Sequence, residues 1–157
     1  MKENTKLLIK SIALPLLAGA VSGLLSSNAM DDFQTLTKPP LSPPAWLFPV
    51  AWTILYILMG YSSYLIRTSD VENETKSNAL MFYNYQLIVN FLWPIFFFNF
   101  GWYFFSLLWL ILLWILVLLM IQSFLKISKR AAYLNIPYLI WLTFAAYLNA
   151  GIWLLNR

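Results

Sequence analysis

The sequence predicts an all-α fold: a polytopic membrane protein built as a bundle of five transmembrane helices. Of its 157 residues, 61% are hydrophobic and only 10% are charged, whereas soluble domains carry about 25% charged residues. The mean hydropathy is +0.71. Five segments reach the roughly 20 mostly apolar residues that a helix needs to cross a bilayer. These are residues 7–27, 46–66, 79–98, 103–125 and 134–155, and we expect a single five-helix domain over residues 1–157.

The apolar runs favour helices over the strands of a membrane barrel. Barrel strands alternate apolar and polar residues over segments of about ten, and the run LLWLILLWILVLLM at residues 107–120 does not alternate. The first run, residues 7–25, is longer than the apolar core of about 7–15 residues in a signal peptide. We therefore expect it to be a membrane span.

Basic residues are distributed unevenly between the two sides of the predicted bundle. Short loops rich in Lys and Arg stay on the cytoplasmic side, and one side carries eight basic residues against two on the other. We therefore predict a multi-pass protein of the cell membrane with a cytoplasmic N-terminus and an external C-terminus. The net charge of +4 then reports topology, and we expect no nucleic-acid partner. The eight residues are Lys2, Lys6, Lys10, Arg67, Lys76, Lys126, Lys129 and Arg130, and the two are Lys38 and Arg157.

The sequence contains neither cysteine nor histidine. These are the usual protein ligands of zinc and of haem iron, so we expect no metal site and no required cofactor. Tyrosine or methionine can still ligate iron, so this composition disfavours haem iron but leaves it as an alternative.

The first span carries a GxxxG pair at Gly19 and Gly23. Small residues at this spacing let helix backbones approach closely in lipid. Packing inside the bundle is the simplest interpretation, and dimerisation or ligand access are the alternatives.

A proline-rich strap precedes the second span. Pro49 fits the first turn of that helix, where backbone N–H groups have no partner within the helix. The prolines upstream favour polyproline II, which has little conformational freedom left to lose. We expect a stiff strap that can stay in place over an opening, formed by Pro39, Pro40, Pro43 and Pro44.

Polar and aromatic side chains share one face of the third and fifth spans. An amide in hydrocarbon needs a partner or it costs free energy. These faces therefore either hold the bundle together through interhelical hydrogen bonds or contact a ligand. The fourth span has almost no polar atom, and we expect no site on it. The third-span face carries Gln86, Asn90, Trp93 and Phe97, and the fifth-span face carries Tyr138, Trp141, Ala145, Asn149 and Ile152.

Three stretches resemble the TspO/MBR family, the tryptophan-rich sensory or translocator proteins that include the peripheral-type benzodiazepine receptor. They are KPPLSPPAWLFPVAWTILYILMGYSSYLI, YQLIVNFLWPIFFF and IPYLIWLTFAAYLNAGIWLLN, and together they cover most of the chain. The resemblance implies a five-helix bundle, often a homodimer, with a pocket beneath the loop between the first two spans. It also implies binding of porphyrins such as protoporphyrin IX, and in many members of isoquinoline carboxamide and benzodiazepine-type drugs.

The resemblance also implies site residues. Matching motif positions assigns the pocket to Trp52, Tyr56, Asn90, Trp93, Trp141 and Ala145, with Gln86 as a weaker candidate. From the face of the fifth span we add Tyr138 as the eighth candidate ligand residue. Tryptophans matching Trp52 and Trp141 are associated with photo-oxidative porphyrin breakdown in some bacterial relatives. The cholesterol motif of animal members is incomplete, because no basic residue follows Tyr147 before Arg157, and we do not transfer cholesterol binding.

Three functions are compatible with these features. The first is a tetrapyrrole-binding sensor or translocator-type protein whose strap closes over the ligand and whose Lys38 either meets a propionate or is simply solvated. The second is light- and oxygen-dependent porphyrin degradation, with Trp52 and Trp141 as the candidate reactive residues. The third is passive transport of a hydrophobic ligand, since no Asp or Glu lies inside a predicted span to couple transport to ions.

The predicted orientation can be tested by cysteine labelling, because the chain has no native cysteine. An impermeant thiol reagent applied to intact cells is expected to label Ser42→Cys in the strap and to leave Ser77→Cys unlabelled until the cells are opened. The reverse pattern would invert the topology.

Overall fold

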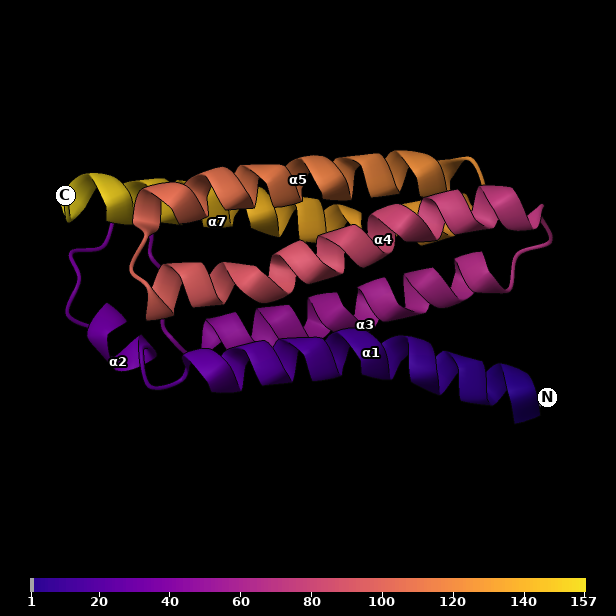
Figure 1. Ribbon diagram of the computed structural model, residues 1–157, viewed down its shortest axis with the longest axis horizontal. Coiled ribbons are helices and arrows are strands. Elements are labelled where there is room, and N and C mark those ends of the chain that lie inside the picture. The colour runs from indigo at the N-terminus through magenta and orange to yellow at the C-terminus, as the bar shows by residue number, and fades with distance from the viewer. Residues whose placement is uncertain (1) are drawn as a thin grey trace.

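Five helices long and apolar enough to cross a membrane make up most of the structure, a computed structural model that describes residues 2–157 (Figure 1). The predicted all-α class and the five spans are confirmed. The long helices are α1 (Lys2–Ser26), α3 (Leu47–Arg67), α4 (Asn73–Pro94), α5 (Tyr103–Leu125) and α7 (Ile136–Leu155), and the short helices are α2 (Met30–Phe33) and α6 (Lys129–Tyr133).

Several helix boundaries differ from the predicted ones. The predicted spans 46–66 and 79–98 leave residues 67–78 between them, but α4 already begins at Asn73 and the connection is only residues 68–72. Likewise α1 begins at Lys2, five residues before the predicted span. A count of apolar residues finds only the part of a helix that lies in hydrocarbon, and polar turns extend these helices beyond it.

The end of α4 is not regular. Pro94 has no N–H to donate within the helix and its ring disturbs the preceding turn. The chain continues as a π-helical segment, η1 (Ile95–Asn99), in which the Phe100 amide donates to the Ile95 carbonyl at 3.1 Å. The sequence-based prediction of one continuous span to residue 98 missed this change of helix type.

Close backbone packing follows a specific order around the bundle. Helix α1 packs against α3 and α4, α4 packs against α5, and α5 packs against α7. Across the described residues, the backbones of α3 and α7 hardly touch. The space between these two helices is therefore filled by side chains.

The connections group the basic residues as predicted. The N-terminus, the α3–α4 connection and the α5–α6 connection lie at one end of the bundle, whereas the C-terminus and α2 lie at the other (Figure 1). All eight residues of the larger basic group therefore belong to the N-terminal end, which we call the basic end. We call the opposite end the strap end.

Candidate functional site

An aromatic cluster fills the space between α3 and α7. The indole of Trp52 stacks on the Tyr56 ring, with centroids 5.5 Å apart and an interplanar angle of 28°. The same indole meets the ring of Trp141 edge-on at 6.4 Å and the ring of Tyr138 at 6.1 Å. Phe48 adds a further edge contact to Trp141 at 6.0 Å. We call these five residues the aromatic seam.

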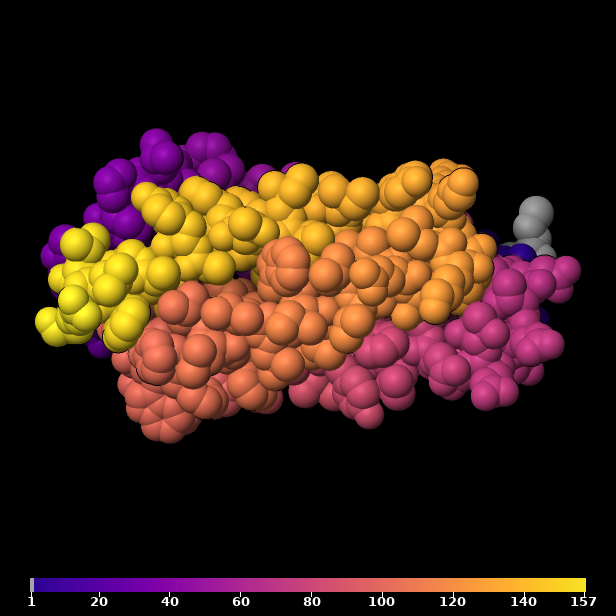
Figure 2. Space-filling model, turned by 90° about the horizontal axis from the view of Figure 1, so that it is seen from above, coloured from indigo at the N-terminus to yellow at the C-terminus, as the bar shows by residue number. Residues whose placement is uncertain are grey.

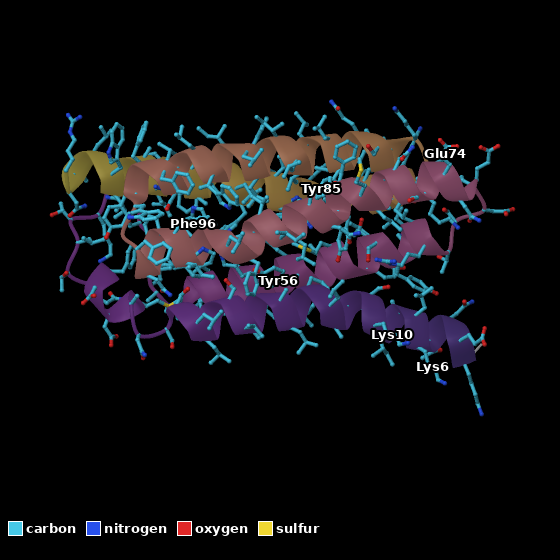
Figure 3. All side chains as sticks on the ribbon, in the orientation of Figure 1. Lys6, Lys10, Tyr56, Glu74, Tyr85 and Phe96 are labelled. Atoms are coloured by element: carbon cyan, nitrogen blue, oxygen red, sulfur yellow. The ribbon has the colours of Figure 1, made fainter. Side chains whose placement is uncertain are left out.

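Hydrogen bonds link this seam to α4. The Tyr56 hydroxyl donates to Asn90 Oδ1 at 3.0 Å, and Asn90 Nδ2 donates to the Tyr138 hydroxyl at 2.6 Å. The Tyr138 hydroxyl in turn donates to Gln86 Oε1 at 2.8 Å. Figure 3 shows Tyr56 inside the bundle, between α3 and α4. The two amides predicted from the sequence are thus joined to two seam hydroxyls, and the chain of bonds ties α3, α4 and α7 together.

One polar group of the seam has no partner. The indole Nε1 of Trp141 is buried and makes no hydrogen bond to any described residue. Buried indole N–H groups usually find an acceptor. The seam therefore contains an unused donor that a ligand acceptor could engage.

Two predicted site residues lie outside the seam contacts. The Trp93 ring stacks on Phe97 at 4.9 Å and its Nε1 donates to Asn149 Oδ1 at 3.2 Å. Asn149 also donates to the Tyr103 carbonyl at 2.8 Å. Ala145 is half-buried and packs against the core. The eight predicted ligand residues therefore divide into six around the seam and two beside it.

The two glycines of the first span have different surroundings. A Cβ at Gly19 would overlap the Tyr56 ring, whereas a Cβ at Gly23 would meet no described atom within 4 Å. Gly19 thus makes room for a seam residue. The pair does not present a common free face, which argues against dimerisation of α1 through GxxxG.

The proline strap is shaped differently from the expected polyproline II segment. Its two Pro-Pro pairs are separated by a turn in which Leu41 has φ +67°, an unfavourable conformation for leucine. The Ser42 hydroxyl stabilises this turn by donating to the Pro39 carbonyl at 2.7 Å. Pro39 is buried, Pro43 is half-buried, and Pro40 and Pro44 are exposed.

The strap is fastened to the C-terminal half of α7. Asn156 Oδ1 accepts from the Thr37 amide at 3.0 Å and Asn156 Nδ2 donates to the Thr37 carbonyl at 2.8 Å. The Tyr147 hydroxyl donates to the Pro40 carbonyl at 2.7 Å. Pro39 sits so close to Gly151 that a Cβ there would lie 2.5 Å from the proline ring. Figure 2 shows the strap segment alongside the C-terminal part of α7. We call these contacts the α7 clamp.

Comparison with known proteins identifies the family. The TspO/MBR family model matches residues 11–154. The chain belongs to the TspO/MBR family. It is 39% identical to protein CrtK of Rhodobacter capsulatus, over 88% of this chain and 86% of that one. It is 40% identical to the tryptophan-rich protein TspO of Chlorobaculum tepidum, over 79% and 78%, and 38% identical to the translocator protein of Ovis aries, over 80% and 75%.

Sequence reasoning missed the clamp of this TspO/MBR chain. Tyr147 was considered only for a cholesterol motif, and neither Gly151 nor Asn156 was singled out. The partner of Asn156 is Thr37, 119 residues away and just before the strap, and the partner of Tyr147 is Pro40 of the strap, 107 residues away. The presence of Gly151 inside an apolar helix was a signal in the sequence that another segment packs closely against that helix.

Asn90→Leu is expected to lower the free energy of unfolding by about 1–2 kcal/mol, because the Tyr56 hydroxyl loses its acceptor. Thermal or denaturant unfolding in detergent measures the change. Ser106→Ala is the matched control, since that buried hydroxyl has no partner among the described residues and its loss should cost little. Unchanged stability combined with lost porphyrin affinity would instead make Asn90 a ligand contact.

Gly151→Ala is expected to push Pro39 off α7 and speed hydrogen exchange of the Thr37 amide about tenfold, the effect of losing roughly one hydrogen bond's stabilisation. Exchange measured by mass spectrometry reports it, with α5 peptides as the internal reference. Gly23→Ala, whose new Cβ meets no described atom, should exchange like the wild type. Equal exchange in both variants would show that the clamp does not hold the strap.

Proposed function

We propose that this TspO/MBR protein binds a porphyrin such as protoporphyrin IX between α3 and α7, under the strap, and so acts as a membrane sensor or translocator-type protein. The observation that carries the proposal is the aromatic seam: two helices whose backbones hardly touch are held apart by Trp52, Tyr138 and Trp141. Family membership supports the membrane sensor or translocator role.

A porphyrin suits the seam for physical reasons. A flat, largely apolar macrocycle gains free energy by leaving water and by stacking on aromatic faces. Its entry requires the seam rings to separate, because they now contact one another. The free Trp141 N–H offers a hydrogen bond to an acceptor on the ligand. A porphyrin without iron is favoured because the chain has no histidine or cysteine.

At the strap end, Lys38 directly precedes the proline strap. Lys38 Nζ lies 5.0 Å from the centroid of the Phe33 ring and donates to the Gln34 carbonyl at 3.3 Å. Both contacts are weak enough to exchange for a propionate carboxylate. We propose that the macrocycle lies in the seam with its propionates toward Lys38.

Orientation and assembly are proposed on other grounds. A cytoplasmic N-terminus is supported by the eight basic residues at the basic end. For a labelling experiment, Leu41 is a more accessible strap position than Ser42, because Leu41 is 83% exposed and Ser42 is half-buried. The homodimer is proposed from the family resemblance alone.

A second candidate function is light-dependent porphyrin degradation with oxygen as the oxidant. It is favoured by the direct contact of Trp52 with Trp141, two oxidisable indoles at the proposed site. The excited porphyrin and oxygen would supply the chemistry, and the protein would supply position and the indole rings.

The double variant Trp52→Phe, Trp141→Phe separates binding from degradation. Phenylalanine keeps much of the packing, so porphyrin affinity should weaken only modestly, by about 0.5–1.5 kcal/mol for each stacking contact. Light-dependent product formation should fall much further if the indoles take part. Fluorescence titration in darkness and absorbance after illumination, at matched porphyrin occupancy, measure the two effects.

Trp46→Phe is the control for this experiment, since Trp46 is 65% exposed and outside the seam. Equal photoproduct yields from the double variant and the wild type would leave binding as the sole role of the seam. If the wild type binds no porphyrin in darkness, the proposed function itself is wrong.

A further inference from the structure

A polar hollow opens on the surface of α4 at the basic end. Its volume is about 500 Å³. No described residue that lines it is acidic, and two are cationic: Arg67, the last residue of α3, and Lys76, in the first turn of α4. Neither side chain forms an ion pair with a described carboxylate. The other lining residues are Asn73, Ser77, Leu80, Met81, Asn84 and Tyr85.

The position of the Lys76 ammonium in this hollow is fixed by the end of α3. It donates to the Ser69 carbonyl at 2.9 Å and to the Arg67 carbonyl at 3.2 Å. An ammonium has three N–H groups, so one is left for another acceptor. The hollow is thus lined by the positioned Lys76 ammonium, by the Arg67 guanidinium, and by two side-chain amides, those of Asn73 and Asn84.

A second, apolar hollow lies further along the same helix. Its volume is about 260 Å³, and it is formed where Ala18 of α1 faces α4. The α4 residues that line it are Leu87, Ile88, Phe91 and Leu92. The Ser22 hydroxyl donates to the Phe91 carbonyl at 2.7 Å and joins the two helices at its border.

The two hollows share one exposed face of α4. Tyr85 lines the polar one and Ile88 the apolar one, and residues three apart are neighbours on a helix surface. Met81, Tyr85 and Ile88 are 40%, 51% and 57% exposed. Figure 3 places Glu74 near the end of the bundle and Tyr85 closer to its middle. The face therefore runs from the bundle end into the region of the hydrocarbon.

The distance from the cationic end of the polar hollow to the apolar hollow matches one leaflet. From Ser77 to Ile88 the helix advances eleven residues, or about 16 Å at 1.5 Å per residue. Half of a hydrocarbon core of about 30 Å is about 15 Å. A group held at Arg67 and Lys76 would thus stand at headgroup depth, with the apolar hollow near the bilayer midplane.

We propose that this face of α4 binds one anionic phospholipid. The phosphate headgroup is held by Arg67 and Lys76, and an acyl chain follows Met81 and Tyr85 into the hollow between α1 and α4. Basic pockets between transmembrane helices are known to bind anionic headgroups. The site is separate from the aromatic seam, because α4 directs Gln86 and Asn90 inward and Tyr85 and Ile88 outward.

Lipid titration of the purified full-length protein in detergent tests this site. Dioleoyl phosphatidylglycerol and dioleoyl phosphatidylcholine are compared, and native mass spectrometry counts the bound lipid. The wild type is expected to bind the anionic lipid at least about fivefold more tightly, and Arg67→Gln should remove about fivefold of that affinity. Lys6→Gln is the matched charge control on exposed α1 and should change it less than twofold.

A second pair of variants tests the chain-binding hollow without altering charge. Ile88→Trp fills the hollow from its exposed rim and should weaken binding of both lipids. Ile140→Trp, at a position on α7 that is 65% exposed, should leave both unchanged. Glycerol 3-phosphate, which carries the headgroup charge without a chain, should bind far more weakly than the lipid.

Three outcomes would overturn the proposal. Equal affinity for the two lipids would remove the anion preference. An equal loss in Lys6→Gln and Arg67→Gln would show diffuse attraction to the whole basic end. Binding of glycerol 3-phosphate as tight as that of the lipid would show a phosphate site without a chain site. None of these measurements uses porphyrin, so they are independent of the proposed function.

Discussion

The structure depends on satisfying buried polar groups where water is absent. In hydrocarbon an amide or hydroxyl without a partner is costly, and α4 places Gln86 and Asn90 at a bundle interior that is almost inaccessible, 0% and 4% exposed. The hydroxyls of Tyr56 and Tyr138 satisfy them. This requirement fixes the rotation of α3, α4 and α7 about their axes, and with it the faces on which the aromatic rings meet.

The same requirement explains why the seam is closed by rings. Since the backbones of α3 and α7 hardly touch, large side chains must fill the gap, and tyrosines can do so while their hydroxyls reach the amides of α4. Tryptophan at positions 52 and 141 adds area but leaves one N–H unsatisfied. Contacts between side-chain rings, and not close backbone packing, therefore join α3 to α7 across the seam.

The sequence predicted which helices form, and which of their faces point inward, better than it predicted which residues contact one another. A stripe of amides and aromatic rings is a local property of a helix, so Asn90, Tyr138 and Trp141 could be assigned to inward faces. Which stripe residue meets which neighbour depends on other helices, and Trp93 bonds to Asn149 outside the seam. The α7 clamp could not be read from the chain, because Asn156 and Thr37 become neighbours only when the bundle closes. The turn at Leu41 was not predicted, because the polyproline II preference of the four prolines was extended to the two residues between them.

The two ends of the seam are held in different ways, and this decides how it can open. At the basic end, Asn135 Nδ2 donates to Ser62 Oγ and Ser62 Oγ donates to the Ala131 carbonyl, both at 2.7 Å and fully buried, joining α3 to α6 and the start of α7. At the strap end the clamp bonds of Asn156 and Tyr147 are exposed, so water can replace them at small net cost. Opening at the strap end therefore breaks only exposed bonds between the strap and α7, whereas opening at the basic end breaks the buried bonds of Asn135 and Ser62. We propose that a ligand enters the seam beneath the strap, with the basic end as the hinge.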